Sequence, residues 1–102
     1  MDKYVCARPV HPGEILKDEI EYHGISQGKL ATQMGMSYKM LNFILNERRP
    51  LTPTTAMMFE AALGVDSDLL MRMQLKYNMR IIKQDKPFAT RLANIRKLVA
   101  AL

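Results

Sequence analysis

The sequence predicts an all-α protein of six helices, and two observations lead to this fold class. Apolar residues recur at spacings of three and four, which places them on one face of a helix. Glycine and proline are scarce, at five each in 102 residues, and most of them stand where such a helix would begin or end. Because 48% of the residues are hydrophobic, the chain can bury one core rather than remain disordered.

The first three helices have clear start signals. The first opens at His11-Pro12-Gly13-Glu14, where proline is tolerated, and closes at Gly24. Ser26 caps the second helix, and Gly35 ends it with a left-handed turn. Ser37 caps the third helix. The residues expected to face the core are Leu30, Ala31 and Met34 on the second helix, and Leu41, Ile44 and Leu45 on the third.

The fourth and sixth helices follow from the same kind of signal. Thr52-Pro53 starts the fourth and Gly64 ends it. Its expected inward residues are Ala56, Phe59, Ala62 and Leu63. After a break at residues 83–87, a sixth amphipathic helix is expected, because apolar residues again recur at helical spacing: Phe88, Leu92, Ile95, Val99 and Leu102. This helix either folds back on the core, pairs with its twin in a second copy, or docks on another protein.

The segment that Asp66 or Ser67 caps is ambiguous between helix and strand. Apolar and polar residues alternate strictly over residues 71–81, which is a strand pattern. The composition favours a helix, because β-branched residues occur only at its end. As a helix it has one apolar stripe at Leu69, Met73 and Tyr77, and another nearly opposite at Met71, Leu75 and Met79. Since one stripe can cover the core, we expect the second to form a dimer interface or to contact the C-terminal tail.

Composition bounds the partners and the organisation of the chain. The net charge of +5 suggests a polyanionic partner. The lone Cys6 and the absence of an apolar run of membrane-spanning length point to the cytoplasm, with no membrane partner. We expect an N-terminal arm over residues 1–11, a main domain over residues 12–80 and a C-terminal helix or tail over residues 81–102. The predicted first helix is acidic, whereas residues 72–97 are basic.

Residues 25–50 match the spacing of a helix-turn-helix motif, with the turn at Gly35-Met36. In that motif the second helix enters the major groove of DNA and presents its N-terminal residues to base edges. Lys39 can donate to guanine, Asn42 can bond adenine, and Tyr38 can contact a phosphate or a thymine methyl group. Phe43 either touches thymine methyl groups or packs under the neighbouring loop, and packing is the favoured alternative.

Phosphate contacts are expected on both sides of this helix. Gln27 begins the preceding helix, where the helix N-terminus adds its positive end. Asn46, Arg48 and Arg49 follow the third helix and can clamp the strand on the far side. Alone, the two arginines are ordinary solvated loop charges, and the preceding helix pair is what favours a functional role.

From about Arg8 to Tyr77 the sequence resembles the HigA antitoxin branch of the Xre-type, phage-repressor-like helix-turn-helix proteins. The motifs that carry this resemblance are His11-Pro12-Gly13-Glu14, Ile25-Ser26-Gln27, Ile44-Leu45-Asn46 and Arg49-Pro50-Leu51-Thr52-Pro53. The resemblance implies a five-helix, lambda-repressor-like domain, here with an additional C-terminal helix. It also implies a homodimer that binds operator DNA, represses its own operon and neutralises an mRNA-cleaving ribonuclease toxin. By similarity, the DNA-contacting positions are Gln27, Ser37, Tyr38, Lys39 and Asn42.

The chain departs from the family pattern at four positions. Gly28 stands where the family often has lysine or arginine, and Met40 where it has threonine or valine. Phe43 stands where glutamate is common, and Glu47 where glycine is common. Glu47 would put a negative charge close to the expected phosphates. We expect these departures to leave the fold intact, but they concern positions that can alter the affinity for DNA and the operator sequence that the protein recognises.

The acidic side of the predicted first helix is the expected toxin-binding surface. A ribonuclease toxin is expected to be basic, so the acidic residues Glu14, Asp18 and Glu21 are the expected contact, with the sixth helix as the competitor. The residues predict no enzyme: neither a nucleophile–base set nor a metal-binding spacing is apparent, and no cofactor is expected. Two alternative functions are a stand-alone Xre-type repressor and a protein-interaction module with weak DNA binding.

Overall fold

The computed structural model describes residues 10–102; residues 1–9, with Cys6 and most of the expected N-terminal arm, lie outside the described residues. The described chain forms six helices and no strand, which confirms the all-α fold. They are α1 (Pro12–His23), α2 (Gln27–Met34), α3 (Tyr38–Leu45), α4 (Pro53–Leu63), α5 (Ser67–Lys83) and α6 (Lys86–Ala100). Between residues 10 and 102, no helix has both the length and the apolar character needed to cross a membrane.

The predicted start and stop signals are the observed ones. Ser26, Ser37 and Thr52 each accept a hydrogen bond from the backbone N–H three residues further on, as N-cap residues do. The glycines that end α1, α2 and α4 all adopt the left-handed conformation, with φ values of 64°, 70° and 76°. Asp66, rather than Ser67, caps α5.

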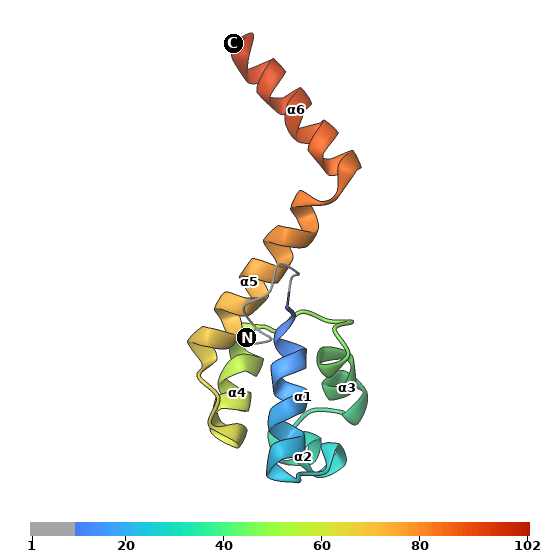
Figure 1. The fold of residues 1–102 in the computed structure, drawn as a ribbon, viewed down its shortest axis with the longest axis vertical. Coiled ribbons are helices and arrows are strands. Elements are labelled where there is room, and N and C mark those ends of the chain that lie inside the picture. The colour runs from blue at the N-terminus through green and yellow to red at the C-terminus, as the bar shows by residue number, and fades with distance from the viewer. Residues whose placement is uncertain (1–9) are drawn as a thin grey trace.

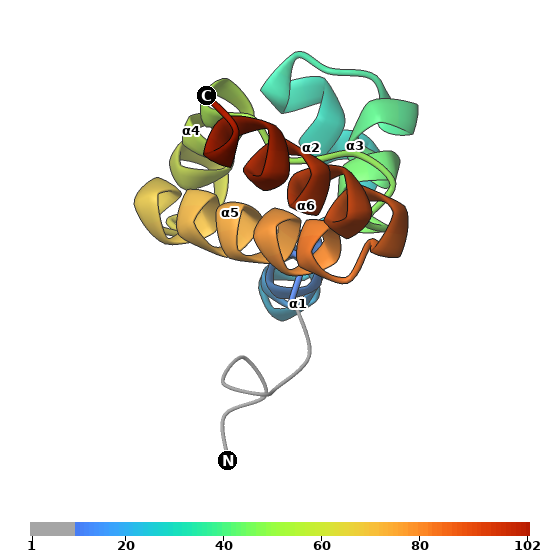
Figure 2. The same ribbon diagram turned by 90° about the horizontal axis from the view of Figure 1, so that it is seen from above.

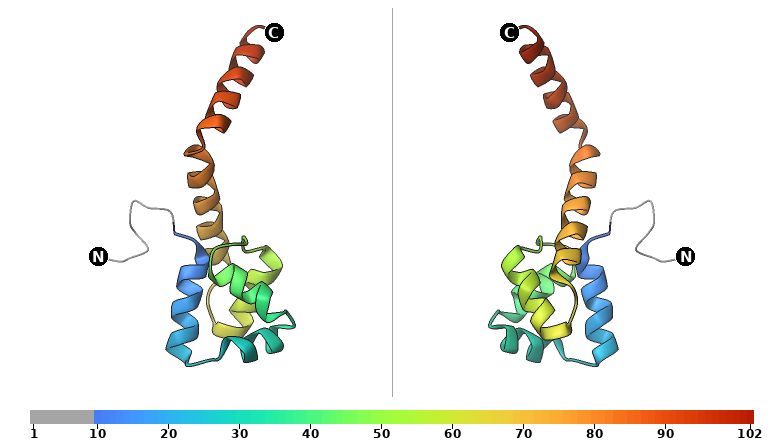
Figure 3. Two further views of the ribbon diagram at one scale, coloured as in Figure 1. Left: turned by 90° about the vertical axis from the view of Figure 1, so that its right-hand side faces the viewer. Right: turned by 90° about the vertical axis from the view of Figure 1, so that its left-hand side faces the viewer.

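One core joins α1 to α5, and α6 projects away from it (Figures 1 and 3). Seen from above, α4 lies on one side of α5 and α1 on the other (Figure 2). The fully buried apolar residues include those predicted for α2 and α3. Ala62 of α4 was expected to face inward and is exposed, because Ala56, Phe59 and Leu63 already define the inward line of that helix.

The prediction that residues 71–81 are helical is confirmed, but the face of α5 that meets the core was predicted wrongly. The buried residues are Leu70 and Gln74, whereas Leu69 of the expected core stripe is exposed. The helix is therefore rotated by about one residue, so that the core lies between the two apolar stripes. Sequence patterning missed Gln74 because it is polar.

Gln74 ties the loop after α3 to α5. Its Oε1 accepts a hydrogen bond of 2.7 Å from the backbone N–H of Leu51, and its Nε2 donates to Asn78 Oδ1 at 2.9 Å. Because a buried amide costs free energy unless it is hydrogen-bonded, this pairing fixes where the chain passes from α3 to α4.

Gly13 lets the start of α1 lie directly on the end of α3. A Cβ atom at residue 13 would stand 2.5 Å from the carbonyl oxygen of Ile44 and 2.9 Å from that of Leu45. These oxygens belong to the backbone and cannot move aside without shifting α3. Only glycine therefore permits this approach.

We expect Gly13→Ala to lower the free energy of unfolding by about 1–3 kcal/mol, the usual cost of forcing an atom into a packed site. Gly28→Ala is the matched control, because a Cβ there meets only Ser26 Oγ, at 3.9 Å. That variant should gain about 0.5–1 kcal/mol, as alanine replaces glycine within a helix. Chemical denaturation measures both changes, and equal effects at the two positions would contradict the close-approach argument.

Candidate nucleic-acid interface

Helix α3 buries one face and displays the other. Leu41, Ile44 and Leu45 are buried, and at about 100° per residue the opposite face is centred on Lys39 and Phe43. The residues predicted to reach DNA are exposed or half-buried. Tyr38 is 56% exposed and Lys39 is exposed. Asn42 is half-buried at the edge of the same face.

The helix before α3 holds it at a fixed angle. Gly35 ends α2 in the left-handed conformation, and the backbone N–H of Met36 donates to Ala31 O at 3.0 Å. Met36 itself packs against the core, and Ser37 then caps α3 through a 3.1 Å bond from Met40 N–H. Because the turn is both capped and anchored, α3 presents its polar face from a rigid support. This is helix-turn-helix geometry.

The N-terminus of α2, the first helix of this motif, carries Gln27. The side chain is half-buried, and its Oε1 is enclosed without a hydrogen-bond partner among the described residues. Unpaired enclosed oxygens are uncommon in folded proteins, so the amide has hydrogen-bonding capacity that the described chain does not use.

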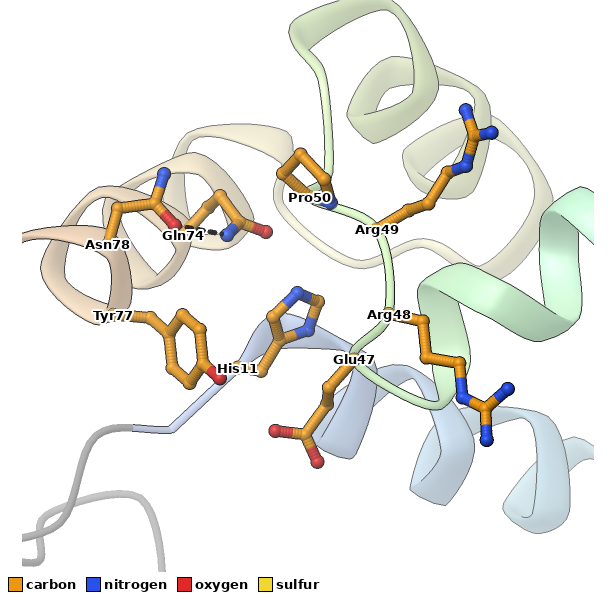
Figure 4. Close-up of a pocket in the computed structure, with 8 residues that line it drawn as sticks. All are labelled: His11, Glu47, Arg48, Arg49, Pro50, Gln74, Tyr77 and Asn78. Carbon is orange, nitrogen blue, oxygen red and sulfur yellow. Dashed lines mark hydrogen bonds between the residues drawn. The ribbon is translucent and has the colours of Figure 1, made fainter. Parts of the chain in front are cut away.

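The loop after α3 carries the basic residues. Asn46 caps the helix, and its Nδ2 donates to Asn42 O at 2.9 Å. The backbone N–H of Arg48 donates to Phe43 O at 2.8 Å, while both arginine side chains remain exposed. Figure 4 shows the side chains of Arg48 and Arg49 directed away from His11 and Tyr77. Two exposed cations thus follow the C-terminal end of α3.

Glu47 adopts the left-handed conformation, with φ of 64°, and is the only non-glycine residue to do so between residues 10 and 102. This conformation costs a residue with a Cβ about 1–2 kcal/mol, which explains why a glycine suits the position. In Figure 4 the Glu47 side chain leaves the loop in a different direction from the two arginines. Its negative charge acts on His11.

His11, the last residue of the predicted N-terminal arm, is buried and joins three parts of the fold. Its Nδ1 accepts a 2.9 Å hydrogen bond from the backbone N–H of Gly13 and so caps α1. It also hydrogen-bonds the backbone of Arg49, and its ring meets the Tyr77 ring edge-on, with centroids 5.0 Å apart. His11 thereby connects α1, α5 and the basic loop.

A shallow hollow of about 230 Å³ opens beside His11 (Figure 4). Its lining also includes Glu47, Gln74, Tyr77 and Asn78. Over residues 10–102, no group of three or more histidine, cysteine or acidic side chains is arranged to hold a metal ion.

The remaining predicted contact residues lie elsewhere. On α1, Glu14 and Asp18 are half-buried and Glu21 is exposed. On α5, Met71 packs against the core of its own chain, whereas Leu75 and Met79 are 62% and 46% exposed.

The comparisons with known proteins agree with this geometry. Residues 16–70, more than half of the chain, match the HTH_3 helix-turn-helix family, and the chain belongs to that family. It is 35% identical over 78 residues to virulence-associated protein I of Dichelobacter nodosus, a match that covers 76% of this chain and 72% of the relative.

Two solved structures extend the similarity. One is an addiction-module antidote protein of the HigA family from Coxiella burnetii, with 29% identity and a TM-score of 0.67; 74% of this chain and 83% of that one are covered. The other is the Pseudomonas aeruginosa antitoxin HigA with the higBA promoter, with 29% identity and a TM-score of 0.65, covering 90% and 91% of the two chains. The resemblance to HigA antitoxins expected from the sequence is confirmed.

The buried state of His11 makes stability depend on pH. Burial lowers the pKa of His11 below 6.5, although the charge of Glu47 and the Arg49 hydrogen bond partly oppose it. The unfolded chain therefore binds the proton more tightly, and the contribution of neutral His11 is full above pH 6.5 and lost as the pH falls below it. We expect the free energy of unfolding to decrease as the pH falls below 6.5, by up to about 1.4 kcal/mol per pH unit.

Denaturant titrations at a series of pH values measure this effect. In His11→Asn, which retains a capping side chain, the decrease should be absent. The exposed imidazole of His23 provides the control, because His23→Asn should keep the decrease. A wild-type profile that is flat over this range would show that His11 does not couple folding to protonation.

Proposed function

We propose that this protein is the DNA-binding antitoxin of a type II toxin–antitoxin system, which neutralises an mRNA-cleaving toxin and represses its own operon. The observation that carries the proposal is the display of Lys39 and Asn42 on a capped, anchored α3, with two exposed arginines directly after it. The similarity of this chain to the HigA antitoxin of Pseudomonas aeruginosa, which was solved with the higBA promoter, supports this choice.

In this proposal the residues divide into base readers and phosphate contacts. Lys39 would donate to guanine acceptors and Asn42 would bond adenine in the major groove. The backbone contacts that set the register would come from both ends of the motif: Gln27, Ser37, Tyr38, Asn46, Arg48 and Arg49. In Figure 4 the Glu47 carboxylate points in a different direction from the two arginine side chains, which lessens its repulsion of the phosphates that they would contact.

The DNA-binding unit is proposed to be a homodimer. Operators of helix-turn-helix proteins have two half-sites, which a two-fold symmetric protein matches. Leu75 and Met79 supply exposed apolar surface on α5, and α6 adds more, whereas Met71 would contribute only its exposed part. Sedimentation at micromolar concentration should give the mass of a dimer, and a monomer would count against this assembly.

The toxin partner is proposed to be a basic ribonuclease encoded beside the antitoxin. Glu14, Asp18 and Glu21 give α1 an acidic side that suits such a partner, and α6 is the competing surface. Coexpression should relieve the growth arrest that the neighbouring gene causes. Persistent arrest would leave the stand-alone repressor as the better assignment.

Two pairs of substitutions test DNA binding. Lys39→Ala with Asn42→Ala should relax sequence preference, at about 1–3 kcal/mol for each lost base contact. Arg48→Ala with Arg49→Ala should weaken all duplexes alike and reduce the slope of affinity against salt by about two for each protomer, or about four for the dimer. Fluorescence anisotropy with promoter and random duplexes at several salt concentrations separates the two patterns.

The controls for this experiment are on α6. Arg96→Ala with Lys97→Ala removes the same net charge as the arginine pair on a helix that projects away from the core, and should leave the slope of affinity against salt unchanged. Equal affinity of the wild-type protein for its promoter and for random duplex would reject specific repression. That result would favour the protein-interaction module with weak DNA binding.

A further inference from the structure

The position of Phe43 is unusual for an aromatic residue. It lies about 150° around α3 from the middle of the buried line of Leu41, Ile44 and Leu45. Its side chain is only half-buried, and it is not among the partly buried residues packed against the core, which are Ile15, Ile25, Met36, Met40, Val65 and Met71. Core packing therefore does not account for this ring.

Phe43 is paired with Lys39, one turn earlier on the same face. The Lys39 ammonium lies over the ring, 5.6 Å from its centroid. Cation–π attraction of this kind orders both side chains, since the ring carries negative charge on its face. The pair therefore displays a cation and an apolar surface side by side, at the centre of the outward face of α3.

We infer that this pair reads a guanine next to a thymine: Lys39 takes the guanine acceptors and the Phe43 ring covers the thymine C5-methyl group. This inference rests on the proposed function. The C5-methyl of thymine is the one apolar group that an ordinary base pair offers in the major groove. A half-buried ring that enters that groove gains most from burial against such a group, because phosphates and the other base edges are polar.

The structure favours a base contact over a protein contact for Phe43. The Lys39 ammonium lies over the ring, and the backbone N–H of Arg48, an exposed basic residue, donates to the Phe43 carbonyl oxygen at 2.8 Å. A ring with one cation over it, and a loop with exposed arginines directly after its helix, suit a polyanion that also carries a methyl group. A basic ribonuclease toxin would be repelled from this surface.

The test has two stages. A randomised duplex library is first selected on the full-length wild-type protein. Each thymine of the enriched sequence is then replaced singly by deoxyuridine, which removes only the methyl group, and affinities are measured by fluorescence anisotropy. One thymine in each half-site should show a loss of about four-fold, the value of one buried methyl group.

The Phe43→Ala variant tests whether Phe43 is the residue that contacts the thymine methyl group. This variant should bind the thymine and deoxyuridine duplexes equally, while keeping the wild-type preference at the other positions. Phe43→Gln gives a second variant should alanine weaken folding, and Met57→Ala, at an exposed methionine of α4, is the control that should retain the methyl effect.

The possible failures are distinguishable. An enriched sequence without any methyl-sensitive thymine overturns the inference and leaves the proposed function standing. If Phe43→Ala and Phe43→Gln both keep the full effect of the methyl group on affinity, another residue makes that contact. This result also overturns the inference and leaves the proposed function standing. Selection that enriches no sequence rejects specific DNA binding and the inference with it.

Discussion

The fold depends on the missing side chain at residue 13. Because Gly13 has no Cβ, the first turn of α1 rests on the carbonyl oxygens of Ile44 and Leu45, which end α3. This contact sets the depth and direction of α3 relative to the rest of the core. It also brings His11 to the base of the loop that carries Arg48 and Arg49. The orientation of the polar face of α3 therefore depends on a packing contact that lies away from that face.

The local features of the fold were predictable from the sequence. Serine, threonine and aspartate caps, and glycines in the left-handed conformation, act through the few residues beside them, so their positions follow from spacing alone. Core residues of α2 and α3 were predictable for the same reason. Ala62 was not, because an alanine fits either side of a helix.

The features that the sequence did not reveal all involve distant partners. Gln74 is a polar residue whose burial makes sense only with Leu51, 23 residues away. His11 looks like part of an arm until Tyr77 and Arg49 are seen around it. The His-Pro-Gly-Glu motif was the available signal for both His11 and Gly13. In the sequence this motif indicates a helix start and a family resemblance, but not the close approach of α1 to α3, because the clash that excludes alanine arises across the fold.

A titration followed residue by residue tests the central claim, that a fixed α3 and its following loop form the surface offered to DNA. Backbone amide shifts of the labelled protein would be recorded by NMR as promoter duplex is added. The largest changes should fall in the first turn of α2, in α3 and in residues 46–49, while the core amides of α1 beside Gly13 stay unchanged. Changes confined to α5 and α6, with α3 unaffected, would contradict this placement of the interface.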